Sequence, residues 1–271
     1  MASPLTVTLE SGLTLSCADH GSASDQLVLL LPGPTDSWRS YQPILDRLPP
    51  DLRAVAVSQR GHGDSDKPET GYRVEDFAAD VVALLDAISV ERAVLAGHSG
   101  SCLVVRRVAL DHPERVAGLI LEASPTTLRG HAGLQEFMDS GLSDLDDPIS
   151  PQFARSFVVD TSSDDVAPEL LDQLVAELLK VPARVWHATF KDLLQYDDTS
   201  ELTQITASTL LLWGDSDALV TREMQDQLAS RIPNARLLVY PGVGHTPRWD
   251  DPSRFSDDIL AFARELLHSG Y

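Results

Sequence analysis

Residues 94–103 read V-L-A-G-H-S-G-S-C-L, and this stretch decides the fold of the chain. The apolar run before Gly97 is typical of a buried strand, and the residues after Ser99 follow a helical pattern. A strand that turns directly into a helix brings two backbones close together, so the turn needs small residues. The stretch therefore predicts a strand, a sharp turn and a helix. Ser99 stands at the exposed apex, beside the backbone N–H groups of the helix start.

The composition is that of a globular protein and excludes several classes of partner. The chain has 271 residues, of which 43% are hydrophobic and 23% are charged, enough for one large α/β domain or a core with an inserted cap. A net charge of −20 argues against nucleic acid and anionic membranes, since both attract clustered Lys and Arg. We therefore expect a small-molecule substrate, and the sequence leaves monomer or homodimer open.

Targeting and metal signals are not apparent in the sequence. The N-terminal residues lack the basic and apolar regions of a secretory signal, and no apolar run approaches the roughly 20 residues of a membrane span. Cys17 and Cys102 form neither a metal-ligand spacing nor a disulfide framework. We expect a cytoplasmic protein that uses no cofactor and no metal.

The order of apolar segments predicts a doubly wound, mostly parallel sheet. Residues 5–9 and 13–17 alternate as in a hairpin, and a helix is expected over 37–48. Continuous apolar runs predict buried strands at 27–31, 54–57, 92–96, 116–121, 209–213 and 236–239. Between 126 and 202 the pattern is helical only. The chain is thus predicted to have a core domain of residues 1–125 and 203–271 with a helical cap of residues 126–202.

A serine hydroxyl needs a base and a group that orients the base before it can act as a nucleophile. His245 lies in a glycine-rich loop directly after the last predicted strand, and Asp217 follows the strand before it. The carboxyl ends of parallel strands meet at one edge of a sheet, so both loops should lie beside Ser99. Three residues in the order Ser, Asp, His on successive loops make a stronger signal than any one of them.

The chain resembles the α/β-hydrolase family over nearly its whole length. The resemblance rests on these segments: Pro32-Gly33, residues 59–65 (Q-R-G-H-G-D-S), Gly97-His98-Ser99, Gly214-Asp215-Ser216-Asp217 and Gly244-His245. It implies a Ser99, Asp217 and His245 catalytic triad under a helical cap. Because the nucleophile position holds serine and not aspartate, the resemblance favours cleavage of an ester or lactone over opening of an epoxide or haloalkane.

Two positions depart from the usual family pattern around the nucleophile. Ser101 stands where the last glycine of the nucleophile turn is expected. Pro34 stands where a backbone N–H usually donates to the oxyanion, and proline has none. Gly100 can still donate. Three alternatives remain for the donor missing at Pro34: the loop shifts so that Thr35 or a side-chain hydroxyl donates, the reaction needs little oxyanion stabilisation, or the protein is a poor hydrolase.

Three further residues are assigned from their positions in the chain. Glu122 ends the strand after the Ser99 helix, where some family members carry the triad acid, so it competes with Asp217 as the partner of His245. A structural role or a place in the pocket is the simpler interpretation of Glu122. Trp186, in the cap, is a candidate for the substrate-binding wall. His98 is expected to be a packed, hydrogen-bonded residue.

These assignments leave three hypotheses. The first is a serine hydrolase that cleaves a carboxylic ester or lactone of a largely apolar substrate through an acyl-enzyme. The second keeps the fold but changes the reaction to C–C bond hydrolysis, perhydrolysis or cofactor-free oxygenation, and Pro34 motivates it. The third is a ligand-binding member with weak catalysis.

Overall fold

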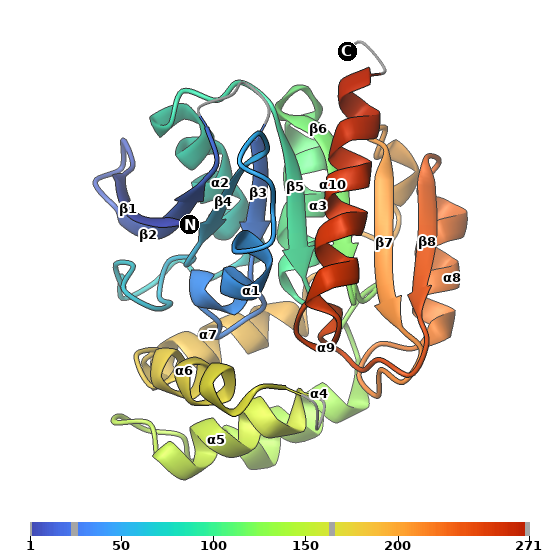
Figure 1. Cartoon of the computed structure of the whole chain (residues 1–271). Coiled ribbons are helices and arrows are strands. Elements are labelled where there is room, and N and C mark those ends of the chain that lie inside the picture. Colours follow the sequence, from blue (N-terminus) through green and yellow to red (C-terminus); the bar gives the residue numbers. More distant parts are fainter. Residues whose placement is uncertain (1, 23–26, 163–165, 269–271) are drawn as a thin grey trace.

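Eight strands form one sheet within residues 2–22, 27–162 and 166–268, which are the residues that the computed structural model describes (Figure 1). The strands are β1 (Ser3–Thr8), β2 (Thr14–His20), β3 (Leu27–Leu31), β4 (Arg53–Val57), β5 (Ala93–His98), β6 (Val116–Glu122), β7 (Thr209–Gly214) and β8 (Ala235–Tyr240). Their spatial order is β1-β2-β4-β3-β5-β6-β7-β8. Only the pairs β1–β2 and β2–β4 are antiparallel among these, so the predicted mostly parallel α/β sheet is confirmed.

Helices cover both faces of the sheet, and α4 to α7 lie beyond the carboxyl ends of its parallel strands (Figure 1). The α-helices are α1 (Gln42–Leu45), α2 (Val74–Ala87), α3 (Ser101–Asp111), α4 (Ala132–Glu136), α5 (Pro151–Asp160), α6 (Pro168–Leu178), α7 (Ala183–Leu193), α8 (Arg222–Arg231), α9 (Pro247–Asp250) and α10 (Pro252–His268). Short 3-10 turns are η1 (Trp38–Tyr41), η2 (Pro113–Arg115) and η4 (Leu202–Gln204), and η3 (Phe137–Gly141) is a π-helical turn.

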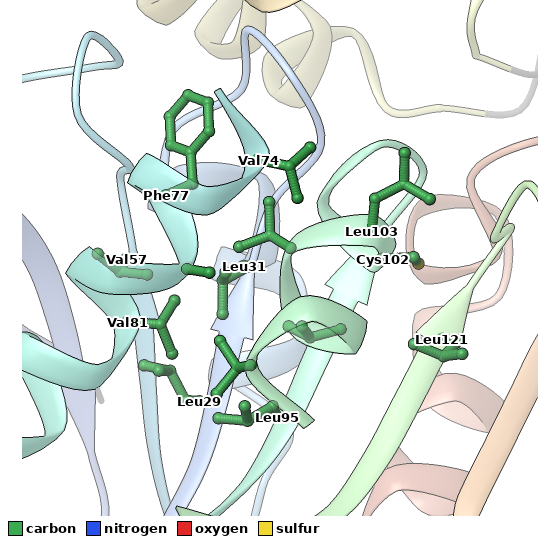
Figure 2. Close-up of a cluster of buried hydrophobic side chains, with 14 of the residues drawn as sticks. Leu29, Leu31, Val57, Val74, Phe77, Val81, Leu95, Cys102, Leu103 and Leu121 are labelled. Carbon is green, nitrogen blue, oxygen red and sulfur yellow. The ribbon is translucent and has the colours of Figure 1, made fainter. Parts of the chain in front are cut away.

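The central strands are buried on both faces, which explains their unbroken apolar runs. Leu29, Leu31 and Leu95 point toward α2 and α3, where they meet Phe77 and Leu103 (Figure 2). The alternate residues of β3 and β5 belong to a second cluster with α1 and α10 on the opposite face. A period of two residues therefore divides each strand between two cores.

The prediction of one continuous helix over residues 37–48 is wrong. The structure has η1 followed by the four-residue helix α1. Pro43 lies in the second position of α1, and a proline lacks the N–H that an extended helix through residues 37–42 would need at this point. The helical turn can restart at a proline but cannot run through it.

The helices α4 to α7 lie between β6 and β7 in the chain, across the carboxyl ends of the parallel strands (Figure 1). The predicted ranges 1–125, 126–202 and 203–271 include short stretches at 1, 23–26, 163–165 and 269–271 that lie outside the described residues. We keep the name cap for residues 126–202.

The two ends of the cap are held by one buried arginine on α3. Arg106 donates from Nη1 to the carbonyl of Pro125, 2.8 Å away, and from Nη2 to that of Thr126, 3.0 Å away, where the cap begins. It also forms a two-point ion pair with Asp198 near the cap's end, at 3.0 and 2.5 Å. Both side chains of this pair are fully buried. The helix that follows Ser99 thus connects the core to both ends of the cap.

Candidate active site

Ser99 occupies a strained turn between β5 and α3. Its φ angle is +53°, in the left-handed region that a residue with a side chain rarely adopts. The backbone N–H of Ser99 donates to the carbonyl of Glu122, 2.9 Å away, which fixes the turn against β6. A Cβ at Gly97 would lie 2.7 Å from the carbonyl oxygen of Ser101, so this turn requires glycine there. The predicted strand, turn and helix are present, and the serine is at the apex.

Ser101 has a structural reason to replace the expected glycine. Its hydroxyl donates to the carbonyl of Pro32, 2.6 Å away, and accepts from the side-chain amide of Gln59 at 2.9 Å. The same amide also donates to Pro32 at 3.2 Å. These bonds connect the start of α3 to the loop that begins at Pro32. The sequence did not point to Gln59, because its partners lie far away in the chain.

His245 and Asp217 lie side by side on the loops after β8 and β7. His245 Nδ1 is 2.8 Å from Asp217 Oδ2, and the Asp217 side chain is fully buried. The other oxygen, Asp217 Oδ1, accepts the backbone N–H groups of Leu219 and Val220 at 2.8 and 3.0 Å. With both oxygens occupied, the carboxylate cannot rotate freely. It therefore presents a fixed acceptor to the imidazole.

The two loops also touch through their backbones. A Cβ at Gly214 would lie 2.2 Å from the carbonyl oxygen of Val243, so no larger residue fits between them. Asp215 Oδ1 accepts the N–H of Gly242 at 2.6 Å and so braces the turn. This contact sets the separation of the loops that carry Asp217 and His245.

His98 packs against His245 from the neighbouring strand end. Its Nε2 donates to the backbone carbonyl of His245 over 3.1 Å, and the two ring centroids are 4.9 Å apart. Burial, together with the charge of Arg248, holds the pKa of His98 well below its usual range, so the ring is neutral. A Cβ at Gly33 would lie 2.6 Å from His98 Nδ1, which explains the glycine at that position. His98 is packed and hydrogen-bonded, in line with its expected role.

Glu122 belongs to a buried ionic cluster beneath the site. Its Oε1 lies 3.2 Å from Arg248 Nη1 and 3.1 Å from the backbone N–H of Arg248, and its Oε2 accepts from the Tyr41 hydroxyl at 3.3 Å. Arg248 also pairs with Asp36 Oδ2 at 2.9 Å. Burial raises the pKa of Glu122 above its usual value, and raises that of Asp36 to about 6. In the structure, Glu122 therefore contacts Arg248 and Tyr41, whereas Asp217 is the carboxylate that is hydrogen-bonded to His245.

A cavity of about 580 Å³ opens between the cap and the sheet edge at Ser99. Ser99, Gly100, His245, Pro34 and Asp36 lie at its base. Apolar side chains from the cap and from the loop after β7 form most of its wall, namely Leu128, Leu134, Phe137, Phe157, Phe190 and Leu219. The volume is in the range of sites for small organic molecules.

Trp186 does not line this cavity, contrary to the expectation for it. The side chain is fully buried in the cap, with its ring centroid 4.8 Å from that of Phe157 and 5.8 Å from that of Phe190. It lies behind the aromatic residues that form the wall. Sequence alone could not separate these layers, because all of them are aromatic positions on cap helices.

A family model described as alpha/beta hydrolase fold matches residues 26–252. The chain belongs to the α/β-hydrolase family. It is 30% identical over 258 residues to a protein of Variovorax paradoxus that carries the name carbamate hydrolase RutD, covering 93% of this chain and 96% of that one. It is 27% identical to a non-heme chloroperoxidase of Streptomyces lividans, and the match covers 96% of this chain and 99% of that protein. The esterase RhEst1 of Rhodococcus sp. has a similar structure, with a TM-score of 0.84 and 26% sequence identity. The match covers 97% of this chain and 99% of the esterase.

In this α/β-hydrolase, the loop after β3 forms a tight turn over residues 33–36. The N–H of Asp36 donates to the carbonyl of Gly33 at 3.1 Å, and Thr35 has a φ of +78°. The Pro34 ring lies against Gly100, since a Cβ at Gly100 would be 2.8 Å from Pro34 Cγ. Thr35 is buried, its hydroxyl has no hydrogen-bond partner, and it is absent from the cavity wall. The expectation that Thr35 replaces the missing donor therefore has no support from its position.

Gly100 is the backbone donor nearest to the nucleophile in sequence. It is the N-cap of α3, and the N–H groups at a helix start have no acceptor within the helix. Gly100 also lines the cavity beside Ser99. Its N–H can therefore donate to a substrate oxygen, with the helix dipole favouring negative charge there.

The described residues contain no metal-binding cluster and no helix that could span a membrane. No group of three or more His, Cys, Asp or Glu side chains with the arrangement of a metal site was found among them. Within the same part of the chain, no helix has both the length and the apolar character that crossing a membrane requires.

In this α/β-hydrolase, the sequence does not indicate the structural roles of Arg248, Gln59 and Asp36, because their partners lie far from them in the chain.

Proposed function

We propose that this protein is a serine hydrolase that cleaves a carboxylic ester or lactone of a small, largely apolar substrate through an acyl-enzyme. The observation that carries the proposal is the convergence of three loops at one cavity. Ser99 stands on a strained turn that lines the cavity, and His245, which lines the same cavity, is hydrogen-bonded to the buried Asp217 at 2.8 Å. A nucleophile, a base and a group that orients the base are the elements that acyl transfer needs.

In the proposed reaction, Ser99 Oγ attacks the substrate carbonyl while His245 Nε2 takes the hydroxyl proton. Asp217 keeps the imidazole in the tautomer with a proton on Nδ1 and stabilises the imidazolium that forms. The Gly100 N–H donates to the developing oxyanion. His245 then returns the proton to the leaving alcohol, and water, activated by the same imidazole, releases the acid.

The choice of an ester over other substrates has three supports. A serine nucleophile forms an acyl-enzyme from an ester, whereas an aspartate nucleophile opens epoxides and haloalkanes. The cavity wall is mostly apolar, with Leu128, Phe137 and Phe190 among its members, which suits an uncharged acyl or alcohol group. The similarity to a Rhodococcus esterase agrees with this substrate class.

Covalent labelling tests the proposal directly. A fluorophosphonate should label the wild-type protein at Ser99 and leave Ser99→Ala unlabelled. With p-nitrophenyl esters of short acids, the wild type should give a burst of one p-nitrophenolate per protein, if hydrolysis of the acyl-enzyme is the slower step. A folded wild-type protein that neither reacts with the fluorophosphonate nor releases p-nitrophenolate would refute the proposed function.

Perhydrolysis is a second candidate because Pro34 removes one backbone donor from the loop beside Ser99. In this reaction hydrogen peroxide, and not water, would take the acyl group from Ser99 and form a peracid. The similarity to a non-heme chloroperoxidase of Streptomyces lividans adds support. Bromination of a diketone dye in acetate, peroxide and bromide measures peracid formation, and its absence in an ester-cleaving preparation rules the candidate out.

A further inference from the structure

The charged side chains that line the cavity are acidic. Within the part of the chain that the structure describes, the wall includes Asp36 and Asp160 but neither lysine nor arginine. Residues 1, 23–26, 163–165 and 269–271 add no Lys or Arg to the sequence. A substrate carboxylate would therefore find no cationic side chain of Lys or Arg on the described wall.

The histidines of the wall have other roles. His98 is kept neutral by burial, which lowers its pKa. His131 Nδ1 accepts the N–H of Leu134 over 3.1 Å, so this nitrogen is occupied by the backbone and does not donate to a ligand. His245 is hydrogen-bonded to Asp217 and serves the nucleophile in the proposed reaction.

Two arginines on elements that border the cavity are paired with acids. Arg248, beneath the base, is fully buried and contacts both Asp36 and Glu122, so two carboxylates share one guanidinium. On α5, Arg155 pairs with Asp172 at 2.8 Å. A carboxylate entering the cavity would compete with existing partners for these cations.

The cap adds a negative field around the cavity. Residues 126–202 contain 15 Asp and Glu against 5 Lys and Arg, so half of the net charge of −20 lies on this segment. Charge of one sign around a cleft lowers the local concentration of ligands with the same sign. Burying an unpaired carboxylate in an apolar wall carries a large desolvation penalty as well.

We propose that this cavity accepts electrically neutral, largely apolar esters and rejects esters that carry a carboxylate. The proposal rests on the proposed ester cleavage for its reaction, but its selectivity concerns binding. Asp36 acts close to Ser99, where it disfavours an anionic leaving group. Asp160, at the end of α5, disfavours an anionic group at the distal part of the substrate.

A matched pair of substrates isolates the charge. The mono-p-nitrophenyl ester of adipic acid ends in a carboxylate, and p-nitrophenyl 6-methylheptanoate carries an isopropyl group of the same shape at that position. At pH 8 we expect the wild-type kcat/KM to be at least about 100-fold higher for the neutral ester. A ratio below about tenfold overturns the proposal, because a tenfold preference is within what a plain apolar wall gives.

Charge reversal separates electrostatics from simple apolar preference. Asp160→Lys should raise the ratio of kcat/KM for the adipate ester to kcat/KM for the neutral ester about tenfold over the wild-type ratio. Asp144→Lys is the matched control, since it changes the net charge equally at an exposed cap residue outside the cavity wall. Equal gains in both variants, or no gain in Asp160→Lys, overturn the role of the cavity wall.

Binding to Ser99→Ala distinguishes failure of this inference from failure of the proposed function. Methyl 6-methylheptanoate and monomethyl adipate are titrated calorimetrically into this variant, which cannot form an acyl-enzyme. Binding of the neutral ester alone supports the selectivity, even if the wild type hydrolyses neither compound. Equal binding of both esters, or binding of neither, refutes it.

Discussion

Replacing Pro34 by alanine should increase the rate of ester cleavage. Pro34 has no N–H, and its ring lies against Gly100 beside the nucleophile. The Pro34→Ala variant places an N–H on the turn of residues 33–36, where the family pattern has a donor to the oxyanion. One such donor contributes about 3 kcal/mol to the stability of the transition state, or about 100-fold in kcat.

The gain should be smaller than that full value. Alanine frees the backbone of a turn that is closed by the hydrogen bond from the Asp36 N–H to the Gly33 carbonyl, 3.1 Å long. Losing the fixed φ of proline costs about 0.4 to 1 kcal/mol of stability, so the loop will hold its geometry for less of the time. We therefore expect kcat for p-nitrophenyl butyrate to rise about tenfold or more, with KM nearly unchanged because the donor acts mainly in the transition state.

Steady-state kinetics with a matched variant decides the point. Thr35→Ala keeps the backbone N–H and removes the buried hydroxyl, which has no partner and does not line the cavity. It should leave kcat within about threefold of the wild type, since it removes no donor that reaches the substrate. If Pro34→Ala is folded and its kcat is equal to or below that of the wild type, the second donor already comes from elsewhere and the reasoning about Pro34 is refuted.

Three further predictions follow from buried charges. Asp217→Asn should lower kcat by about 10⁴, because the His245 imidazole loses the acceptor that selects its tautomer. Glu122→Gln should mainly lower the melting temperature. The reverse pattern would make Glu122 the acid that orients His245. Arg106→Met should lower the free energy of unfolding, measured in urea, by about 3 kcal/mol, because it leaves the buried carboxylate of Asp198 unpaired. Arg222→Ala, at an exposed ion pair, should change the free energy of unfolding by less than about 1 kcal/mol. Equal effects of the two variants would contradict this ranking. Burial raises the pKa of Asp36 from its ordinary value of 3.8 to about 6 in the folded protein, so the contribution of this carboxyl to stability is present at low pH and lost as pH rises. The stability of the wild type relative to Asp36→Asn should therefore fall by on the order of 2 kcal/mol between about pH 4 and 6, and a flat difference in urea unfolding curves would exclude the raised pKa.

The arrangement of strands and the turn at Ser99 could be predicted because their signals are local. Buried parallel strands such as residues 27–31 need apolar side chains on both faces, so they appear as continuous runs. The nucleophile turn needs Gly97 because two backbones pass at contact distance. The helix predicted over 37–48 is interrupted in the structure, because Pro43 lacks the N–H that an unbroken helix needs there.

The site needed tertiary structure wherever a partner is distant in the chain. The sequence left Asp217 and Glu122 as competing partners of His245. The fold brings Asp217 to 2.8 Å from the imidazole and directs Glu122 to Arg248, across 126 positions of sequence. A carboxylate contains no local sign of which cation or imidazole it will meet, so sequence alone could not separate the two.

By itself, the sequence determined the fold class, the position of Ser99 at the apex and the order of Ser99, Asp217 and His245. These follow from periodicity and from steric limits that act between neighbouring residues. Only the tertiary structure decided that Ser101 holds the loop at Pro32, that Arg248 joins Asp36 to Glu122, and that Trp186 lies behind the cavity wall. Long-range hydrogen bonds, ion pairs and packing layers depend on which surfaces the folded chain brings together, and no short stretch of sequence records them.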